Sequence, residues 1–364
     1  MTLNELKTTE ARRQFLEKTL NVNLENIQKC HLEDEKNIHC ENLVGATSIP
    51  LGVAGPIQNY YIPLATTEGA LVASVNRGCK AIRLSGGAMI VVEQVGVTRG
   101  PVFETKGISE SLKLKKWLND NFGLLKNTAE KTSSHLKLKK IETTTTGCYV
   151  YVRFYFDTQD AMGMNMVTIA TDLMSQIIEN KTRIKCLSIS GNFCVDKKPS
   201  WLNFISGRGK KVWAEVILKE KVIKEVLKTT SQKLYDVWLS KCLIGSIMSG
   251  SLGFNSHFAN IVAAFFAATG QDLAHVVEGS LGITTMKIIN KDLYVSVYLP
   301  DVMLGTVGGG TKLKIKKEAL SIMGVKNSIE LAEVLGGAVL AGEISLLASL
   351  SEGSLAKTHK RLGR

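Results

Sequence analysis

Four short stretches of this 364-residue sequence carry polar groups where packing alone would not favour them. In the first, TTEGALVASVNRG, Glu68 precedes an apolar segment of helical pattern. A carboxylate there either complements the helix dipole or, when partly buried, holds and delivers a proton. In the second, Asp196, Lys197 and Lys198 follow an apolar strand and precede Pro199. This charge triplet is either an exposed turn or a strand-end site in which an aspartate fixes a lysine that stabilises an oxyanion.

The third and fourth stretches each add a histidine. Within GFNSHFANIVAAFFAATGQDLAH, His257 and Asn260 share one helix face, and Asp272 follows at the end of the apolar run. Each can be a satisfied core group, but an unpaired buried polar group costs about 1–3 kcal/mol, so three together favour a site. In the tail, LAKTHKRLGR, His359 lies on a basic segment too short to be core, which by itself is typical of a frayed end.

The formal net charge of +12 is concentrated in two places. Residues 106–140 hold nine lysines against three acids, and the last eight residues hold four basic residues and no acid. Such patches attract polyanions, either nucleic acid or a phosphorylated cofactor, unless they are a solvated surface. Aromatic residues that would stack on bases are few there, so we expect no nucleic-acid partner. The seven cysteines form no CxxC pair and no zinc-type cluster with histidine, so we expect no metal centre.

The chain shows no pattern typical of export or of a membrane span. Its N-terminus is charged and lacks the apolar core of a signal peptide, and an odd number of cysteines is typical of reduced thiols. The longest uncharged run, residues 243–271, is broken by glycine, serine, Asn255 and His257, which leaves an apolar part too short for a bilayer. We therefore expect a cytoplasmic protein with no membrane partner.

The elements that must position these groups alternate between helix and strand. The patterns predict a helical segment over 1–40, helices over 69–84, 109–122 and 161–180, strands over 89–95, 148–156 and 186–190, and long buried apolar helices over 245–278 and 329–350. Neither a GxGxxG fingerprint nor a P-loop is present. Asp160–Met166 opens a helix and Gly305–Thr311 forms a glycine-rich loop, and backbone amides in such places hold phosphates. The residues alone thus predict an enzyme with a Glu/Lys/Asp/His site and an anionic ligand.

Taken in order, these stretches resemble the 3-hydroxy-3-methylglutaryl-coenzyme A (HMG-CoA) reductase family, in the form shared by eukaryotes and many archaea. The motifs that carry the resemblance run from Glu41 to His359, and they are ENLVGATSIPLGVAGP, TTEGALVASVNRGC, GVTRGPV, DAMGMNM, SGNFCVDKKP, GRGK, GFNSHFANIV, GQDLAH, GTVGGGT and LAGEISLLASLSEGSLAKTH. The combination of DAMGMN, DKKP and TTEG in one chain is highly specific, and the resemblance covers nearly the whole sequence.

The resemblance implies an α+β fold in three parts. These are a short helical N-terminal segment (1–40), a large substrate- and CoA-binding domain around a long central buried helix with a C-terminal flap (41–100 and 189–364), and an inserted small α+β domain that binds NADP(H) (101–188). It implies reduction of HMG-CoA to mevalonate and CoA by two hydride transfers from NADPH, in the mevalonate pathway of isoprenoid biosynthesis.

By this resemblance, each catalytic role falls on a residue already singled out. Glu68 matches the proton-donating glutamate, and Lys197 matches the lysine that stabilises the oxyanion. Asp272 matches the aspartate that links these two, and His359 matches the tail histidine that protonates the departing CoA thiolate. An inactive relative would lack one or more of these four residue types, so the resemblance implies an active enzyme.

The binding residues also transfer by position. Those that match the pocket for the hydroxymethylglutaryl group are Arg99, Ser190, Asp196, Lys198, Lys241 and Asn260, and Arg77 and Lys80 match positions that hold CoA. Those that match cofactor contacts are Asp160, Met162, Gly163, Met164, Asn165, Gly308, Gly309 and Gly310. Ser134 stands where vertebrate members have an arginine near the 2′-phosphate, and Ser133, His135, Lys137 or Lys139 are expected to replace it, so NADPH is expected rather than NADH. The family also implies a homo-oligomer, a dimer or a dimer of dimers, with active sites shared between subunits.

Overall fold

The computed structural model describes residues 6–25, 38 and 40–353, and its contacts divide the chain into two units, residues 1–50 and 51–364. In the first unit, α1 (Thr9–Leu20) begins where the Thr8 hydroxyl accepts a hydrogen bond from the Ala11 N–H. It ends at Asn21, whose backbone is in the left-handed conformation. This helix confirms part of the helical segment predicted for residues 1–40, and the rest of that segment lies mostly outside the described residues.

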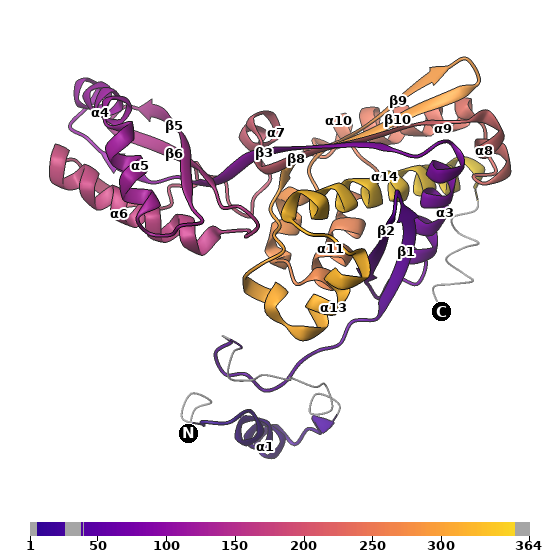
Figure 1. Cartoon of the computed structure of the whole chain (residues 1–364), viewed down its shortest axis with the longest axis horizontal. Helices are drawn as coiled ribbons and strands as arrows, with labels where there is room; N and C mark the ends of the chain where they lie inside the picture. Colours follow the sequence, from indigo (N-terminus) through magenta and orange to yellow (C-terminus); the bar gives the residue numbers. More distant parts are fainter. Residues whose placement is uncertain (1–5, 26–37, 39, 354–364) are drawn as a thin grey trace. The chain divides into compact units, whose positions relative to one another are not determined.

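An eight-stranded sheet forms the framework of the second unit, and all its strand pairs are antiparallel (Figure 1). Its order is β7 (Lys185–Ser188), β4 (Val102–Glu104), β6 (Tyr149–Asp157), β3 (Met89–Arg99), β8 (Arg208–Leu218), β10 (Asp292–Val302) and β9 (Ile283–Ile289), with β5 (Lys137–Thr146) paired to β6. Strand β3 belongs to both halves, because Met89–Gly96 pairs with β8 and Val97–Arg99 pairs with β6.

The larger hydrophobic core surrounds α14 (Ser328–Glu352), a 25-residue helix that is buried over nearly all of its length. It packs on α3 (Leu71–Leu84), where Gly78 allows the two backbones to touch, since a Cβ at Gly78 would lie 1.9 Å from the Ala341 carbonyl oxygen. Helix α14 is long and apolar enough to cross a membrane by composition, but 83% of its apolar window is buried inside the fold. Its hydropathy is therefore that of a core helix.

The remaining elements around this core are short. They are β1 (Leu51–Ile57) and β2 (Tyr60–Ala65), which pair as a hairpin, α7 (Trp201–Ser206), α8 (Glu220–Glu225), α9 (Ser231–Trp238), a π-helix (Leu239–Gly245), α10 (Ser246–Ser249), α11 (Phe258–Thr269), a 3₁₀ turn (Leu273–His275), α12 (Val276–Gly279), a second 3₁₀ turn (Gly309–Lys312) and α13 (Lys314–Met323).

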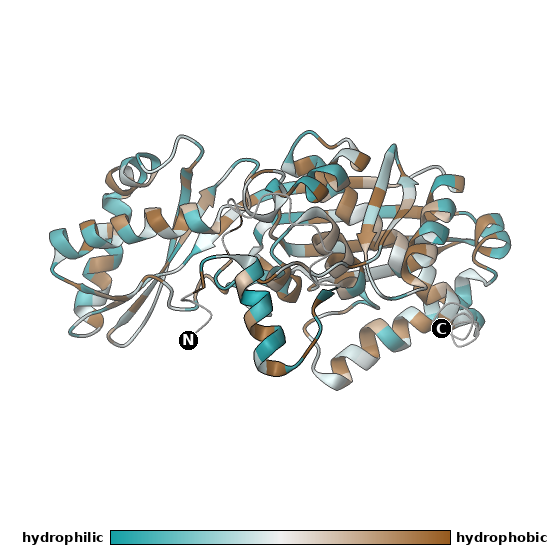
Figure 2. Ribbon diagram, turned by 90° about the horizontal axis from the view of Figure 1, so that it is seen from below, coloured by the Kyte–Doolittle hydropathy of each residue, from teal (hydrophilic) through white to brown (hydrophobic). Residues whose placement is uncertain are grey.

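A second hydrophobic core lies between β4–β7 and three helices, α4 (Ile108–Asp120), α5 (Phe122–Glu130) and α6 (Met164–Thr182). Its buried residues come from 97–184, with Met303 as the one contribution from elsewhere in the described chain. The helices that flank the sheet alternate hydrophobic and hydrophilic residues along their length (Figure 2), as expected of helices with one buried face. Seven of the nine lysines of residues 106–140 lie on α4, α5 and β5, and all nine except the half-buried Lys126 are exposed.

The mixed helix-and-sheet class and the buried central helix are confirmed, but the long helix predicted over 245–278 is wrong. Gly250 and Gly270 adopt φ of 68° and 73°, which end α10 and α11. Asn255 accepts a hydrogen bond from the Phe258 N–H (3.2 Å), so the chain turns before α11 starts. These breaks place His257 and Asn260 at the first turn of α11 and Asp272 just beyond its end.

Candidate active site

The loop after β7 presents Lys197 in a conformation that is unfavourable for its residue type. Asn192, Val195 and Lys197 have φ of 61°, 49° and 57°, in the left-handed region. Each such non-glycine residue costs roughly 1–2 kcal/mol, so the surroundings must hold the loop in place. The Thr98 hydroxyl donates to the Cys194 carbonyl (2.9 Å), Asn203 donates to the Val195 carbonyl, and the Lys197 N–H donates to Glu278.

The Lys197 ammonium forms an ion pair with Asp272, with 2.8 Å between Nζ and Oδ2. The hydrogen bond that Lys197 donates to Asp272 raises the pKa of Lys197 against a smaller opposing effect of burial. Burial by itself raises the pKa of Asp272, but hydrogen bonds from Lys197 and from the Ala274 N–H outweigh it, so this pKa is lowered. The pair therefore consists of a cation and an anion at neutral pH, and a fixed cation of this kind can stabilise a developing oxyanion.

Glu68 lies in the segment between β2 and α3, three residues before the helix begins. Its Oε2 accepts a hydrogen bond from Asn260 Nδ2 at 3.0 Å, although the two residues are 192 positions apart. The sequence left open whether this carboxylate complements the helix dipole or is partly buried, and Glu68 is exposed within the single chain. Among the described residues, no hydrogen bond or ion pair joins Glu68 to Asp272. The role of Asp272 as the link between Glu68 and Lys197 therefore stays a prediction.

An open cavity of about 730 Å³ lies beside the Lys197 loop. Its lining includes Pro199, which follows Lys198, together with Lys241, Asn255 and His257. Lys241 belongs to the π-helix, so the helical irregularity places this cation at the cavity. The structure thus brings a predicted substrate-binding lysine close to the loop that carries Lys197 and Lys198.

Four other predicted substrate and CoA residues make contacts within the chain. Asp196 Oδ2 lies 3.8 Å from Arg99 Nη1, and Ser190 Oγ lies 3.8 Å from Cys194 Sγ. Arg77 contacts α14 instead, because its Nε donates to Ser345 Oγ (3.0 Å) and its guanidinium also reaches the next turn of that helix. Burial lowers the pKa of Arg77. Lys80, one turn further along α3, is exposed.

The two candidate cofactor segments lie together. The Asp160 carbonyl accepts hydrogen bonds from the Thr306 and Val307 N–H groups at 2.8 and 3.4 Å, and Ala161 forms a bridge with Val307. Gly163, with φ of 88°, starts the 19-residue helix α6, and no side chain caps its N-terminus. A Cβ at Gly308 or Gly309 would meet nothing within 4 Å, so this loop borders open space. Free amides at a long helix start beside an open glycine loop suit a phosphate group.

Two more predicted cofactor residues lie close to this helix. Ser133 Oγ is 3.7 Å from the Met166 sulfur, and His135 Nδ1 is 2.9 Å from Gln159 Oε1. Asp160 itself is engaged by its Oδ1, which accepts from the Ser328 N–H at 2.8 Å. The predicted catalytic residue His359 lies outside the described residues.

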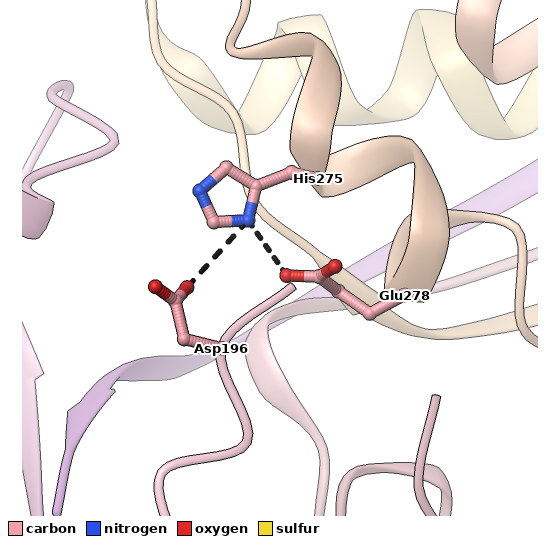
Figure 3. A group of neighbouring side chains, drawn as sticks. All are labelled: Asp196, His275 and Glu278. Atoms are coloured by element: carbon pink, nitrogen blue, oxygen red, sulfur yellow. Dashed lines mark hydrogen bonds and ion pairs between the residues drawn. The ribbon is translucent and has the colours of Figure 1, made fainter. Parts of the chain in front are cut away.

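Sequence reasoning missed a group of buried charged residues beneath the Lys197 loop. Arg208 is fully buried, and it donates from Nη2 to Asp196 Oδ1 (2.7 Å) and from Nη1 to Glu278 Oε1 (2.9 Å). The signal was present in the sequence, because Glu278 and His275 follow Asp272 at spacings that return to one side of a short helix. Figure 3 shows the His275 ring with Nδ1 facing the carboxylates of Asp196 and Glu278.

A second layer of this group supports the loop from α7 and β10. Asn203 donates from Nδ2 to the Val195 carbonyl (2.9 Å) and to Asp301 Oδ2 (2.6 Å), and it accepts a hydrogen bond from Arg153 Nη2 (2.8 Å). Burial raises the pKa of Asp301 to about 8, although the Arg208 charge opposes this effect. The loop therefore lies on a polar layer that belongs to the protein interior.

Comparisons with known proteins agree on one family. The model of the hydroxymethylglutaryl-coenzyme A reductase family matches residues 8–364. The chain is 49% identical to the 3-hydroxy-3-methylglutaryl-coenzyme A reductase of Methanocaldococcus jannaschii over 98% of this chain and 93% of that protein. It is 48% identical to the enzyme of the same name from Methanothermobacter thermautotrophicus, over 97% and 92%.

A solved structure shares the fold. The class II 3-hydroxy-3-methylglutaryl-CoA reductase from Streptococcus pneumoniae, bound to NADPH in open conformations, superposes with a TM-score of 0.70 at 17% identity, covering 96% of this chain and 100% of that one. The likeness at this identity concerns the architecture, while the archaeal relatives carry the family assignment.

Proposed function

Because this chain belongs to the hydroxymethylglutaryl-coenzyme A reductase family, we propose that it reduces HMG-CoA to mevalonate and free CoA, with NADPH as the reductant. The observation that carries the proposal is the 2.8 Å ion pair between Lys197 and Asp272, on a loop held in a strained conformation beside an open cavity. Such a fixed cation is what the reduction of a carbonyl requires, since negative charge develops on the oxygen as hydride arrives.

The overall reaction consumes two hydrides and two protons. The first hydride adds to the thioester carbonyl carbon, and the resulting hemithioacetal breaks its C–S bond to give an aldehyde and CoA thiolate. The second hydride reduces the aldehyde to the primary alcohol. Lys197 stabilises the oxyanion in both additions, Glu68 donates a proton to the alcohol oxygen, and His359 protonates the thiolate. Asp272 holds the Lys197 ammonium in place and charged.

For the substrate, we propose that Arg99, Ser190, Asp196, Lys198, Lys241 and Asn260 hold the hydroxymethylglutaryl group and that Arg77 and Lys80 hold CoA. Lys241, which lines the cavity, supports this proposal, because the free carboxylate of the substrate needs cationic partners. The contact between Asn260 and Glu68 supports it as well, since it places a binding residue against the proton donor.

For the cofactor, the residues present fit a dinucleotide phosphate. The N-terminus of α6 has no side-chain cap, and a Cβ at Gly308 or Gly309 would meet nothing within 4 Å, so both segments offer backbone amides to a ligand. NADPH supplies hydride when it is bound. We propose that Asp160, Met162, Gly163, Met164, Asn165, Ser133, Gly308, Gly309 and Gly310 contact it, within an inserted domain of residues 101–188. The separate hydrophobic core of this region supports the domain proposal.

We further propose that the protein acts in the cytoplasm as a homo-oligomer, a dimer or a dimer of dimers, with active sites shared between subunits. The exposure of Glu68 in the single chain supports sharing. A proton donor for a hydride transfer works best when it is shielded from water, and a second subunit would supply that shielding. The mostly buried apolar face of α14 supports a protein without a membrane partner.

The test is a spectrophotometric assay of the purified protein with HMG-CoA and either NADPH or NADH, following the loss of reduced-nicotinamide absorbance. We expect two cofactors oxidised per mevalonate, faster with NADPH. Lys197→Ala should lower kcat by at least about 100-fold, because it removes an oxyanion partner. Lys221→Ala, at an exposed lysine of α8, is the matched control and should keep the wild-type rate. Near wild-type turnover of Lys197→Ala would refute the oxyanion role.

A further inference from the structure

Glu278 lies at the centre of the polar layer beneath the Lys197 loop. It belongs to α12, its side chain is fully buried, and its Oε1 accepts three hydrogen bonds. The donors are the Lys197 backbone N–H at 3.1 Å, Arg208 Nη1 at 2.9 Å and His275 Nδ1 at 2.6 Å. One carboxylate oxygen thus joins the backbone of the proposed catalytic lysine to two buried cationic or polar side chains.

The bond to Lys197 matters because of the conformation of that residue. A lysine with φ of 57° relaxes to a right-handed or extended conformation unless its backbone is held. Such a relaxation would turn the direction in which the side chain leaves the loop. Among the described residues, Glu278 is the hydrogen-bond acceptor for the Lys197 N–H. Glu278 therefore fixes the direction from which the ammonium approaches Asp272.

His275 approaches the same ion pair from its other side. Its ring is fully buried, with Nδ1 on Glu278 and Nε2 3.7 Å from Asp272 Oδ2, the oxygen that binds Lys197. Nε2 has no hydrogen-bond partner among the described residues. The ring therefore lies between the Glu278 carboxylate, which its Nδ1 contacts at 2.6 Å, and the Asp272 carboxylate, which its Nε2 faces at 3.7 Å.

A metal ion is a poor alternative explanation for this cluster. The ligand atoms of Asp196, His275 and Glu278 do lie within 4.8 Å of one another. However, the guanidinium of Arg208 already donates to both carboxylates, at 2.7 and 2.9 Å. Burial by itself lowers the pKa of Arg208, but the surrounding carboxylates outweigh it, so this pKa is raised and the group stays charged. A divalent cation at the same place would face this positive charge.

We propose that Glu278 and His275 are positioning residues for the Lys197–Asp272 pair: Glu278 holds the Lys197 backbone, and His275 holds the Asp272 carboxylate against Glu278. The role rests on the proposed function, since the ion pair is the proposed oxyanion site. Neither side chain touches the substrate. Their loss should lower the rate of hydride transfer and leave the binding of HMG-CoA and NADPH largely intact.

The first experiment compares Glu278→Ala with Glu278→Gln. The glutamine keeps an oxygen that can accept from the Lys197 N–H, whereas the alanine removes it. We expect kcat to fall about 100-fold in Glu278→Ala, the effect of a misplacement of about 1 Å, and about 10-fold or less in Glu278→Gln. KM for HMG-CoA and the Kd for NADPH should stay within about threefold of wild type, since the contacts proposed for them are retained.

The second experiment separates the two edges of His275. An asparagine amide can replace Nδ1, which contacts Glu278, and a glutamine amide can replace Nε2, which faces Asp272. If His275 holds Asp272, His275→Gln keeps more activity than His275→Asn, by about 10-fold in kcat. An equal rate for the two variants, or a faster His275→Asn, would overturn the role of the Asp272-facing edge.

A purely structural role is excluded by a core variant matched in stability. Ile223→Val removes one buried methyl group from α8 in the large core and serves as that control. If the Glu278 variants lose kcat only as much as Ile223→Val at an equal loss of thermal stability, or lose KM and NADPH binding together with kcat, the proposal is overturned.

A last readout does not depend on activity. The protein is labelled with ¹³C at the Cε of its lysines, and the lysine signals are followed by NMR as the pH is changed. The Lys197 signal is assigned from its absence in Lys197→Ala. In wild type the pKa of Lys197 is raised. We expect it to fall toward the ordinary lysine value in Glu278→Ala and His275→Asn, because the ion pair loosens. An unchanged Lys197 pKa in both variants would overturn the inference, whereas inactive wild-type protein with the expected NMR changes would overturn the proposed function alone.

Discussion

Asp301 allows the electrostatics of the polar layer to be tested through stability. This carboxyl group is completely buried on β10, and its Oδ2 accepts from Asn203 Nδ2 at 2.6 Å while its Oδ1 has no hydrogen-bond partner among the described residues. Burial raises its pKa from 3.8 to about 8, against the opposing charge of Arg208, whose Nη1 lies 4.0 Å away. The perturbation we choose is Asp301→Asn, which removes the proton equilibrium and keeps an oxygen for Asn203.

The sign follows from the direction of this shift. Because the folded-state pKa lies above the unfolded-state value, the contribution of Asp301 to stability is fully present below about pH 4 and is lost as pH rises toward 8. Within that window the unfolded chain releases a proton that the folded protein keeps. The free energy of unfolding thus falls by about 1.4 kcal/mol per pH unit from this one group. Asp301→Asn lacks this slope, so its stability relative to wild type rises by about 3 kcal/mol between pH 5.5 and 7.5.

The assay is urea unfolding of wild type and Asp301→Asn at pH 5.5, 6.5 and 7.5, and the quantity compared is the difference between the two proteins at each pH. Taking the difference cancels the other titrating groups that the two proteins share. Asp236→Asn, at an exposed aspartate of α9, is the control and should run parallel to wild type at all three pH values. If the Asp301→Asn difference is also independent of pH, then Arg208 and Asn203 compensate for the burial of an ionised Asp301, and our reasoning is wrong.

Two further outcomes are expected. Asp272→Asn should lower kcat by about 100-fold with little change in the binding of NADPH, because it removes the charge that pairs with Lys197 at 2.8 Å. A rate within threefold of wild type in the absorbance assay would contradict the role of that pair. Gly78→Ala should destabilise the protein by about 1–3 kcal/mol or more in thermal unfolding, since its Cβ would lie 1.9 Å from the Ala341 carbonyl oxygen. Gly123→Ala is the control and should be neutral or stabilising, because a Cβ there meets nothing within 4 Å. Equal melting temperatures of the two variants would disprove the close contact between α3 and α14.

The sequence was most informative where periodicity was strong and continuous. The apolar run at 329–350 and the alternating run at 148–156 predicted α14 and β6 to within two residues at each end. The prediction over 245–278 was wrong, because an apolar composition hides chain reversals at single glycines. Gly250 and Gly270 end their helices by adopting positive φ, and nothing in the hydropathy of the segment marks that choice.

For the site, the sequence identified the residues but not the contacts among them. Lys197 and Asp272 stood out because charges interrupt apolar stretches, and the structure joins them. The polar layer was missed because Arg208 stands in the basic stretch RGKK and Glu278 is a lone acid beside a glycine, and both patterns usually mean solvent exposure. Their burial depends on the ion pair between Arg208 of β8 and Glu278 of α12, which are 70 residues apart in the chain. Only the tertiary fold brings such partners together.

The polar layer is difficult to explain as a source of stability. Replacing buried ion pairs by apolar residues of similar volume is often neutral or stabilising, so Arg208 and its partners gain little for the fold itself. Their hydrogen bonds instead end where orientation matters: on the Lys197 N–H through Glu278, on Asp196 of the same loop, and on the Met164 sulfur at the start of α6, 3.2 Å from Arg208 Nη2. One guanidinium therefore contacts both the loop of the proposed oxyanion lysine and the helix proposed to hold the cofactor. Directional bonds can fix the relative position of two such segments, whereas apolar packing in the same place leaves them free to slide.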